Sequence, residues 1–286
     1  MQTKDKFIAF VDILGFSRIV EELQEGGGGL GRAFDLIEAL GSPEGKNKFA
    51  AYGPTLCPGS RHNEKTLDFE ITQISDCVIV STEVSPAGAI NLVGHCCGIA
   101  LKLMSKGALC RGKITRGHVY HADNQVVGVA YQQAVSGEKY TRFLRADESE
   151  IGTPFIEIDD TVVSYVRDET DNCVREMFRR VTRSDGEYTA IYPFTAMENK
   201  PFTTVHPAFD FDPEKWLASV RLSMKMHLAR IATFEAALER TNDPKARQKI
   251  SHYLKGLQPR VERLKAKEAR ALEILESGEI PWGAVL

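Results

Sequence analysis

Two short apolar stretches decide the fold, FIAFVDILG at residues 7–15 and ITQISDCVIV at residues 71–80. Each is typical of a β-strand region, and each has one aspartate in it, Asp12 in the first and Asp76 in the second. An ionised carboxylate in so apolar a segment is costly unless a positive group pairs with it. Two of them therefore predict a shared divalent metal ion. Ligands that are all oxygen favour Mg²⁺ or Mn²⁺ over zinc.

Composition places the chain among ordinary globular proteins, with 286 residues, 43% of them hydrophobic, and a formal net charge of −3. That length suffices for one large domain, or for a domain with an extension. The near-neutral charge gives no electrostatic basis for binding nucleic acid. No apolar run approaches the roughly 20 residues that cross a bilayer, and the first residues lack the apolar core of a signal peptide. We therefore expect a cytoplasmic protein without nucleic-acid or membrane partners.

The cysteines contain no C-x-x-C pair, and no histidine–cysteine cluster has the spacing of a zinc site. Four of them fall in apolar strand or helix patterns. This distribution predicts buried, reduced thiols, as is usual in the cytosol. The six positions are Cys57, Cys77, Cys96, Cys97, Cys110 and Cys173.

The order of the segments predicts an α+β fold, in which strands alternate with helical stretches to form a sheet with helices on one face. This domain is expected over residues 1–210, with a loop insertion at 41–66 that is rich in Gly, Pro, Asn, Lys and Ser. Residues 211–286 show apolar positions at steps of three and four, which predicts a helical hairpin that stabilises the protein or its dimer. Pro259 is expected to kink this hairpin, and His227 is expected to pack in its core.

Polar groups near the first aspartate suit phosphate binding. The strand ends in a turn and a helix start at Gly15, Phe16 and Ser17, where free backbone N–H groups could hold phosphate oxygens. In the segment LCRGKITRGHVY, residues 109–120, Arg111 could grip a phosphate through two parallel hydrogen bonds. For Arg116, the simpler interpretation is a surface ion pair. For Asp76, it is an ordinary turn residue.

Four motifs together resemble the catalytic domain of class III nucleotide cyclases: FVDILGFS, ISDCVIV, RGKITRG and VVGVAYQQA, spread over roughly residues 5–160. The resemblance implies that Asp12, Asp76 and the carbonyl of Ile13 bind two Mn²⁺ or Mg²⁺ ions per site. It also implies that the amides of residues 15–17 cradle the phosphates and that Arg111 clamps the phosphate tail. In that family two domains form the active site head to tail, so a homodimer is expected.

The departures from that family concern the residues that read a purine. Thr72 stands where purine cyclases carry a lysine that reads the base, and Gln125 stands where an aspartate or cysteine does so. Gln132 replaces the asparagine that orients the ribose, and Ser136 replaces the arginine that stabilises the transition state. These differences argue against an adenylate or guanylate cyclase. We expect Thr72, Gln125 and Gln132 to face the base and ribose from the partner subunit.

The opening L-G-F-S, the bare S-D hairpin and R-G-x-I-x-x-G are similar to the pyrimidine cyclases of the bacterial Pycsar anti-phage system. The resemblance implies conversion of UTP to 3′,5′-cyclic UMP and pyrophosphate, and a separate effector that the product activates. Arg116 or Lys139 would replace the missing arginine. Alternatives remain: a cytidylate cyclase that makes cyclic CMP from CTP, a degenerate module that senses nucleotide without turnover, a diguanylate-cyclase or polymerase-palm relative, and a scaffold.

Overall fold

A computed structural model of the chain comprises two compact units, residues 1–199 and 200–286. The structure describes residues 2–24, 29–41, 57, 59–62, 64, 66–196 and 212–278. Most of the predicted loop insertion at 41–66 lies outside the described residues, and so does the predicted domain boundary at 210–211.

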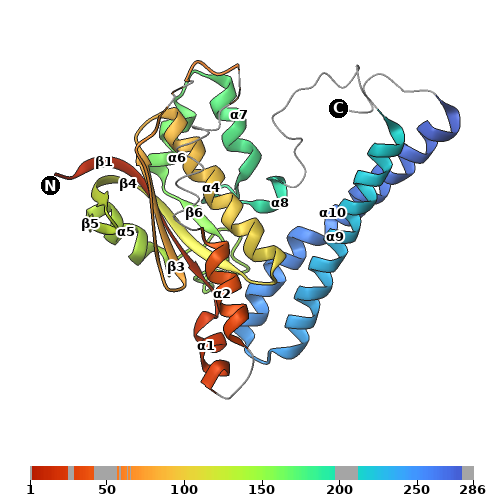
Figure 1. Cartoon of the computed structure of the whole chain (residues 1–286), viewed down its shortest axis with the longest axis horizontal. Helices are drawn as coiled ribbons and strands as arrows, with labels where there is room; N and C mark the ends of the chain where they lie inside the picture. Colours follow the sequence, from red (N-terminus) through yellow and green to blue (C-terminus); the bar gives the residue numbers. More distant parts are fainter. Residues whose placement is uncertain are drawn as a thin grey trace. The chain divides into compact units, whose positions relative to one another are not determined.

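The first unit is built on an eight-stranded mixed sheet in the order β2-β3-β1-β4-β6-β8-β7, with β5 paired to β4 (Figure 1). The central strand β1 runs antiparallel to both neighbours, β3 and β4, while β4 and β6 are parallel. The strands are β1 (Lys4–Ile13), β2 (Phe69–Ile74), β3 (Cys77–Glu83), β4 (Cys110–Ala122), β5 (Gln125–Gly128), β6 (Ile156–Ile158), β7 (Thr182–Ser184) and β8 (Thr189–Ile191).

Helices cover the sheet on both faces. Phe7 of β1 packs edge-on against Tyr165 of α6, whereas its neighbour Ile8 points the other way and joins a core cluster with Ile79 and Ala130 of α5. The predicted α+β architecture is confirmed, and the structure adds α5 on the second face. The helices are α1 (Phe16–Gln24), α2 (Gly29–Ala39), α4 (Pro86–Ser105), α5 (Val129–Glu138), α6 (Asp160–Arg167), α7 (Asn172–Val181) and α8 (Pro193–Ala196).

Coverage on both faces explains why β1 is an almost unbroken apolar run rather than an alternating one. Phe7, Ile8, Ala9 and Val11 are all fully buried. The other interior element is α4, which begins at Pro86 after the N-cap Ser85 and packs against β1, β3 and α7. Among the described helices, α4 has the length and apolar composition of a membrane-crossing segment, but 72% of that apolar stretch is buried inside the protein, as in a core helix.

The second unit is a helical hairpin of α9 (Pro213–Arg240) and α10 (Pro244–Ser277), which pack along each other as predicted. Each helix begins with proline after an aspartate cap, Asp212 or Asp243. His227 is 1% exposed, and its Nε2 lies 2.9 Å from the carbonyl oxygen of Leu257. The prediction of a packed core histidine is confirmed, and burial lowers the pKa of His227. The helix α10 continues through Pro259.

All six cysteines are free, but only Cys96, Cys97 and Cys110 are buried. Cys57, Cys77 and Cys173 are half-buried, so the expectation of uniformly buried thiols is wrong for these three. The reason differs from one to the next. Cys77 begins β3 at the end of a hairpin, and the other two lie at the periphery, in the segment before β2 and in the first turn of α7.

Candidate functional site

The ends of two strands bring the predicted carboxylates together. Asp12 is one residue from the end of β1 and lies opposite Cys77 of β3. Asp76 precedes Cys77 in the two-residue turn between β2 and β3, where Ser75 has a φ of +54°. The backbone N–H of Ile13 donates to the carbonyl oxygen of Asp76 at 3.0 Å. Asp76 is therefore a turn residue, and its turn is docked onto the end of β1 beside Asp12.

This end of the sheet carries an excess of negative charge. The pKa of Asp12 is raised from 3.8 to about 7, first by burial and then by the negative charges of Glu138 and Asp76, while Arg111 and Lys139 offset part of the effect. The same three carboxylates, together with burial, raise the pKa of the Cys77 thiol to about 11. A nearby cation favours the ionised form of a buried carboxyl group whose pKa is raised in this way. The electrostatics therefore suit a site that takes up positive charge.

Glu138 is a member of this group that the sequence analysis did not find. It is the last residue of α5 and only 2% exposed. Ala130, Ala134 and Glu138 are the buried residues of α5, spaced by four, so they form one stripe that faces the sheet. A carboxylate that continues a buried alanine stripe was the signal available in the sequence.

Arg111 is fixed from two sides next to Asp12. It lies directly opposite Asp12 in the pairing of β1 with β4, and its Nε donates to a carboxylate oxygen of Glu138. Gly152, with a φ of +71°, lies against its guanidinium, so that a Cβ at that position would be 2.7 Å from Nη1. The structure thus places the predicted phosphate clamp beside the carboxylate pair and holds it there through Glu138.

The donors at this site fit a magnesium-type ion better than an all-protein metal cage. Within the described ranges, no group of three or more His, Cys, Asp or Glu side chains is arranged to hold a metal. Asp12 and Asp76 would therefore supply two carboxylates and leave the other positions to backbone, water and substrate oxygens. Mg²⁺ commonly binds in this way, through one or two carboxylates plus substrate phosphates. The residues present fit the predicted Mn²⁺ or Mg²⁺.

The predicted phosphate-binding turn follows directly. Gly15 has a φ of +76°, which favours glycine, and α1 begins at Phe16. The preceding Leu14 N–H donates to the carbonyl of Leu109 at 2.9 Å, which ties the turn to the residue before β4. The side chain of Phe16 is buried and Ser17 is exposed. The three amides at residues 15–17 thus start a helix three residues after Asp12, and their role with phosphate stays a prediction.

Thr72 is placed differently from the sequence expectation. It is 5% exposed, and its hydroxyl lies 3.0 Å from His121 Nε2. The other ring nitrogen, Nδ1, lies 2.8 Å from the Ser81 hydroxyl. Thr72 is therefore part of a buried polar chain across the sheet, and we withdraw it from the base-binding set. Its neighbour in this chain is 49 residues away in sequence, which explains why the pattern did not show it.

Gln125 and Gln132 are exposed, on β5 and α5 respectively. Gln125 pairs with Ala122 at the far end of β4 from Arg111. Eleven residues of strand separate Ala122 from Arg111, a distance of roughly 36 Å. Gln125 therefore does not share a site with Arg111 of the same chain, and its predicted contact with substrate requires a second subunit.

The two candidates for the missing transition-state cation separate clearly. Arg116 is five residues from Arg111 on the same strand, so the two side chains point to opposite faces of the sheet. The Arg116 guanidinium lies over the rings of Phe7 and Tyr165, and its Nη2 pairs with Asp5 at 2.8 Å. It is on the opposite face of the sheet from Asp12, so its prediction as a catalytic cation is wrong and the surface ion pair is confirmed. Lys139 follows Glu138 and lowers the pKa of Asp12, which places its charge at the site.

No protein-family model matches the chain, and no curated protein matches it. Nine chains among solved structures do match. One is the catalytic core of a rhodopsin-guanylyl cyclase with converted specificity in complex with ATPalphaS, at 15% sequence identity and a TM-score of 0.38, covering 67% of this chain and 97% of that one.

Proposed function

We propose that this protein is a nucleotide cyclase of the class III type, which joins the ribose 3′-hydroxyl of a nucleoside triphosphate to its α-phosphate and releases pyrophosphate. The observation that carries the proposal is the meeting of Asp12 and Asp76 at one end of the sheet, where the pKa of Asp12 is raised to about 7. The cyclase-like motifs in the sequence provide independent support, because the same two positions are the metal ligands that the resemblance implies.

The chain's own residues suggest how the reaction would be supported. Asp12 and Asp76, with the carbonyl of Ile13, would hold two Mn²⁺ or Mg²⁺ ions. When bound, these ions lower the pKa of the attacking hydroxyl and offset the charge of the triphosphate. Arg111 presents a planar set of donors beside Asp12 and would orient the phosphate tail. Glu138 keeps that guanidinium in place.

The remaining polar groups complete the proposed arrangement. The amides of Gly15, Phe16 and Ser17 would bind the outer phosphates at the start of α1. Lys139 is the remaining cation that would stabilise charge developing on the α-phosphate. Since the described site lacks a purine-reading pair within one chain, Gln125 and Gln132 would reach the base and ribose from the partner subunit of a homodimer.

For the substrate we propose UTP, which gives cyclic UMP, with CTP and cyclic CMP as the alternative. The support is that the residues with which purine cyclases read the base are replaced here by Thr72 and Gln125. Thr72 is buried and does not itself read a base. The proposed setting is a second messenger in bacterial anti-phage defence, which acts on a separate effector. These finer proposals rest on the sequence resemblance.

A nucleotide sensor without turnover is a second candidate. It is favoured by Ser136, which occupies the position of the usual arginine and whose hydroxyl donates to the carbonyl of Gln132 within α5. A pure sensor, however, has little use for a second carboxylate whose charge raises the pKa of Asp12. The presence of Asp12 and Asp76 side by side therefore favours catalysis.

The test is to incubate the purified protein with each of the four ribonucleoside triphosphates and Mn²⁺, and to separate the products by chromatography. We expect a cyclic nucleotide and pyrophosphate in equal amounts from UTP or CTP, and none from ATP or GTP. Asp12→Asn and Asp76→Asn should abolish both products. The matched control is Asp168→Asn, because the Asp168 side chain is 72% exposed at the end of α6.

Each other result has a definite meaning. Product from ATP or GTP would contradict the pyrimidine assignment and leave the cyclase proposal intact. Nucleotide binding without product from any of the four would support the sensor. Full activity in either aspartate variant would contradict the proposed site.

A further inference from the structure

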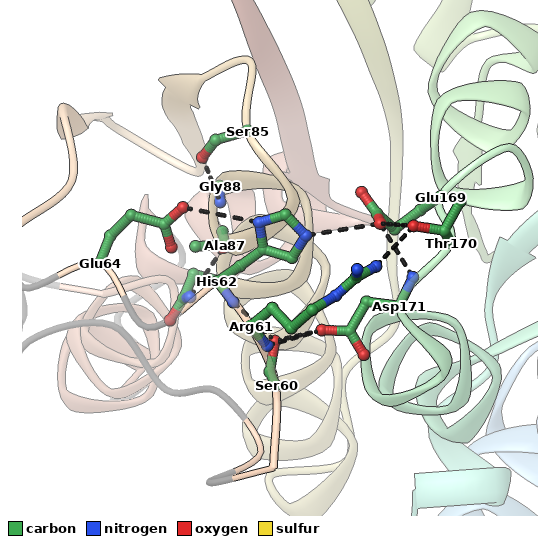
Figure 2. A network of polar contacts seen from close by, with 11 residues as sticks. Ser60, Arg61, His62, Glu64, Ser85, Ala87, Gly88, Glu169, Thr170 and Asp171 are labelled. Atoms are coloured by element: carbon green, nitrogen blue, oxygen red, sulfur yellow. Dashed lines mark hydrogen bonds and ion pairs between the residues drawn. The ribbon is translucent and has the colours of Figure 1, made fainter.

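The segment before β2 is fastened to the N-terminus of α7, far along the chain. The Ser60 hydroxyl donates to Asp171 Oδ2 at 2.7 Å, and the Arg61 backbone N–H donates to the same oxygen at 2.9 Å (Figure 2). The other oxygen, Oδ1, accepts from the Cys173 N–H at 2.8 Å and caps the helix. These hydrogen bonds, led by that from Ser60, lower the pKa of Asp171 to about 2. The carboxylate thus ties the segment and the helix together at neutral pH.

A second set of contacts surrounds the same helix terminus. The backbone N–H of Cys57 donates to Met177 Sδ at 3.2 Å, one turn beyond Cys173. On the other side, Arg61 Nη2 donates to the Thr170 hydroxyl at 2.6 Å (Figure 2). Contacts at Cys57 and at Arg61 therefore hold the two ends of this short stretch along α7. Cys173 lies between these two contact points, Thr170 and Met177, in the sequence.

The consequence is that two cysteine side chains from distant parts of the sequence, Cys57 and Cys173, lie at the same place beside Gly59. Both side chains are half-buried, so small molecules in solution can reach them, unlike Cys96, Cys97 and Cys110 in the core. Both sulfur atoms approach Gly59, where a Cβ would lie 3.6 Å from Cys173 Sγ and 3.9 Å from Cys57 Sγ. The two sulfur atoms are therefore at most about 7.5 Å apart, so a rotation of the two side chains could bring them to the length of a sulfur–sulfur bond.

We propose that Cys57 and Cys173 form a reversible disulfide when the protein meets a peroxide, and that this bond locks the segment preceding β2 onto α7. The Cys57 sulfur attacks one peroxide oxygen, the O–O bond breaks and water leaves, which gives a sulfenic acid on Cys57. The Cys173 sulfur then attacks the Cys57 sulfur, the S–O bond breaks and a second water leaves. Two thiols are oxidised and one peroxide is reduced. A thiol reductant reverses the bond. This proposal is independent of the nucleotide chemistry.

The surroundings also set the expected rate. Interaction with the Cys57 side chain, followed by burial and by the charges of neighbouring groups, raises the pKa of the Cys173 thiol. The thiolate is the reactive form of cysteine, so the pair reacts with peroxide faster as the pH rises. A reducing environment keeps the pair reduced. The contacts through Asp171 and Met177 hold the segment that carries Cys57 against the helix that carries Cys173. The pair therefore behaves as a slow oxidation site rather than a structural disulfide.

The test treats the reduced full-length protein with hydrogen peroxide at pH 8, followed by alkylation and peptide mass mapping. We expect one link between Cys57 and Cys173, loss of two hydrogen atoms from the intact mass, and a rise in Tm of about 5 °C. Cys57→Ser and, separately, Cys173→Ser should lose both the link and the rise. The matched control, Cys77→Ser, should keep both, because Cys77 is also half-buried but belongs to β3, not to α7 or the segment before β2.

Three results would overturn the proposal. One is a link between a different pair of cysteines. Another is sulfenic or sulfinic acid on Cys57 with Cys173 still alkylatable. The third is a rise in Tm that persists in both serine variants. Dithiothreitol added after oxidation should restore both free thiols, and a link that resists it would contradict reversibility.

Discussion

Replacing Asp12 with asparagine should make the metal-free protein more stable, although it should also remove the proposed activity. The folded protein raises the pKa of Asp12 from 3.8 to about 7. Between these pH values the folded state binds more protons than the unfolded chain, so the stability of the wild type falls as the pH rises through this window. Asparagine cannot ionise and escapes this loss. The stabilising effect of the substitution should therefore grow from pH 4 to pH 7 and then level off.

The size of the effect follows from the same two values. A pKa that rises from 3.8 to about 7 corresponds to at most about 4 kcal/mol. Asp12 is only partly buried, and solvent screening reduces such values, so we expect about 2 kcal/mol at pH 8. For a folding unit of this size, that gain corresponds to a Tm increase of about 4–8 °C. At pH 5 the gain should be less than half as large, because pH 5 is only about one unit above the unfolded pKa, whereas the gain keeps growing until the pH reaches the folded pKa of about 7.

The assay is thermal or urea unfolding of both proteins in a chelator, at pH 8 and at pH 5. The matched control is Asp68→Asn, for which the opposite sign is expected. Burial acts to raise the pKa of Asp68, but hydrogen bonds from Lys6 and Lys4 outweigh it and lower the pKa. Ionised Asp68 therefore stabilises the fold above its unfolded pKa, and this contribution is lost as the pH falls. Asp68→Asn should be the less stable protein at pH 8.

Addition of Mn²⁺ completes the design. The ion should raise the Tm of the wild type and leave that of Asp12→Asn unchanged, since a ligand stabilises only the state that binds it. The reasoning would be refuted if Asp12→Asn were no more stable than the wild type at pH 8. It would also be refuted if the gain were equal at pH 5 and pH 8.

Three further substitutions test the surroundings of the site and the clamp on α7. Glu138→Gln should shift the pH–rate profile to lower pH, because it removes a negative charge near Asp12. It should also raise the KM for the triphosphate several-fold, because Arg111 loses its partner. An unchanged KM in initial-rate kinetics would contradict this. Gly152→Ala should destabilise the protein by about 1–3 kcal/mol in urea unfolding, because a Cβ would lie 2.7 Å from Nη1 of Arg111 at a φ of +71°. Asp171→Ala should cost about 1–2 kcal/mol by the same method, since it removes the cap of α7, and a cost no larger than that of Asp168→Ala would count against the clamp.

Much of the architecture follows from local patterns. The apolar run of β1 predicted a strand, and the three-and-four spacing in residues 211–286 predicted the α9–α10 hairpin. The meeting of Asp12 and Asp76 was also predictable, because the turn of a hairpin that pairs with β1 lies beside the end of β1. Strand alternation also separates Arg111 from Arg116, since residues five apart point to opposite faces.

What the sequence could not supply depends on contacts between distant segments. Glu138 becomes part of the site only because α5 crosses the sheet on the second face and ends beside Arg111. Thr72 is buried because His121 reaches it from another strand. The thiol pair of Cys57 and Cys173 depends on a segment that Asp171 holds in place. Neither the pairing of Thr72 with His121 nor that of the two thiols has a period or a motif that can be read along one stretch of chain.

The most direct test of the cyclase proposal is a crystal structure with Mn²⁺ and a non-hydrolysable UTP analogue, in which manganese is located by its anomalous scattering. We expect two manganese peaks beside the carboxylates of Asp12 and Asp76, with the analogue's phosphates beside Arg111. Manganese bound elsewhere, or an analogue bound away from these two carboxylates, would contradict the account.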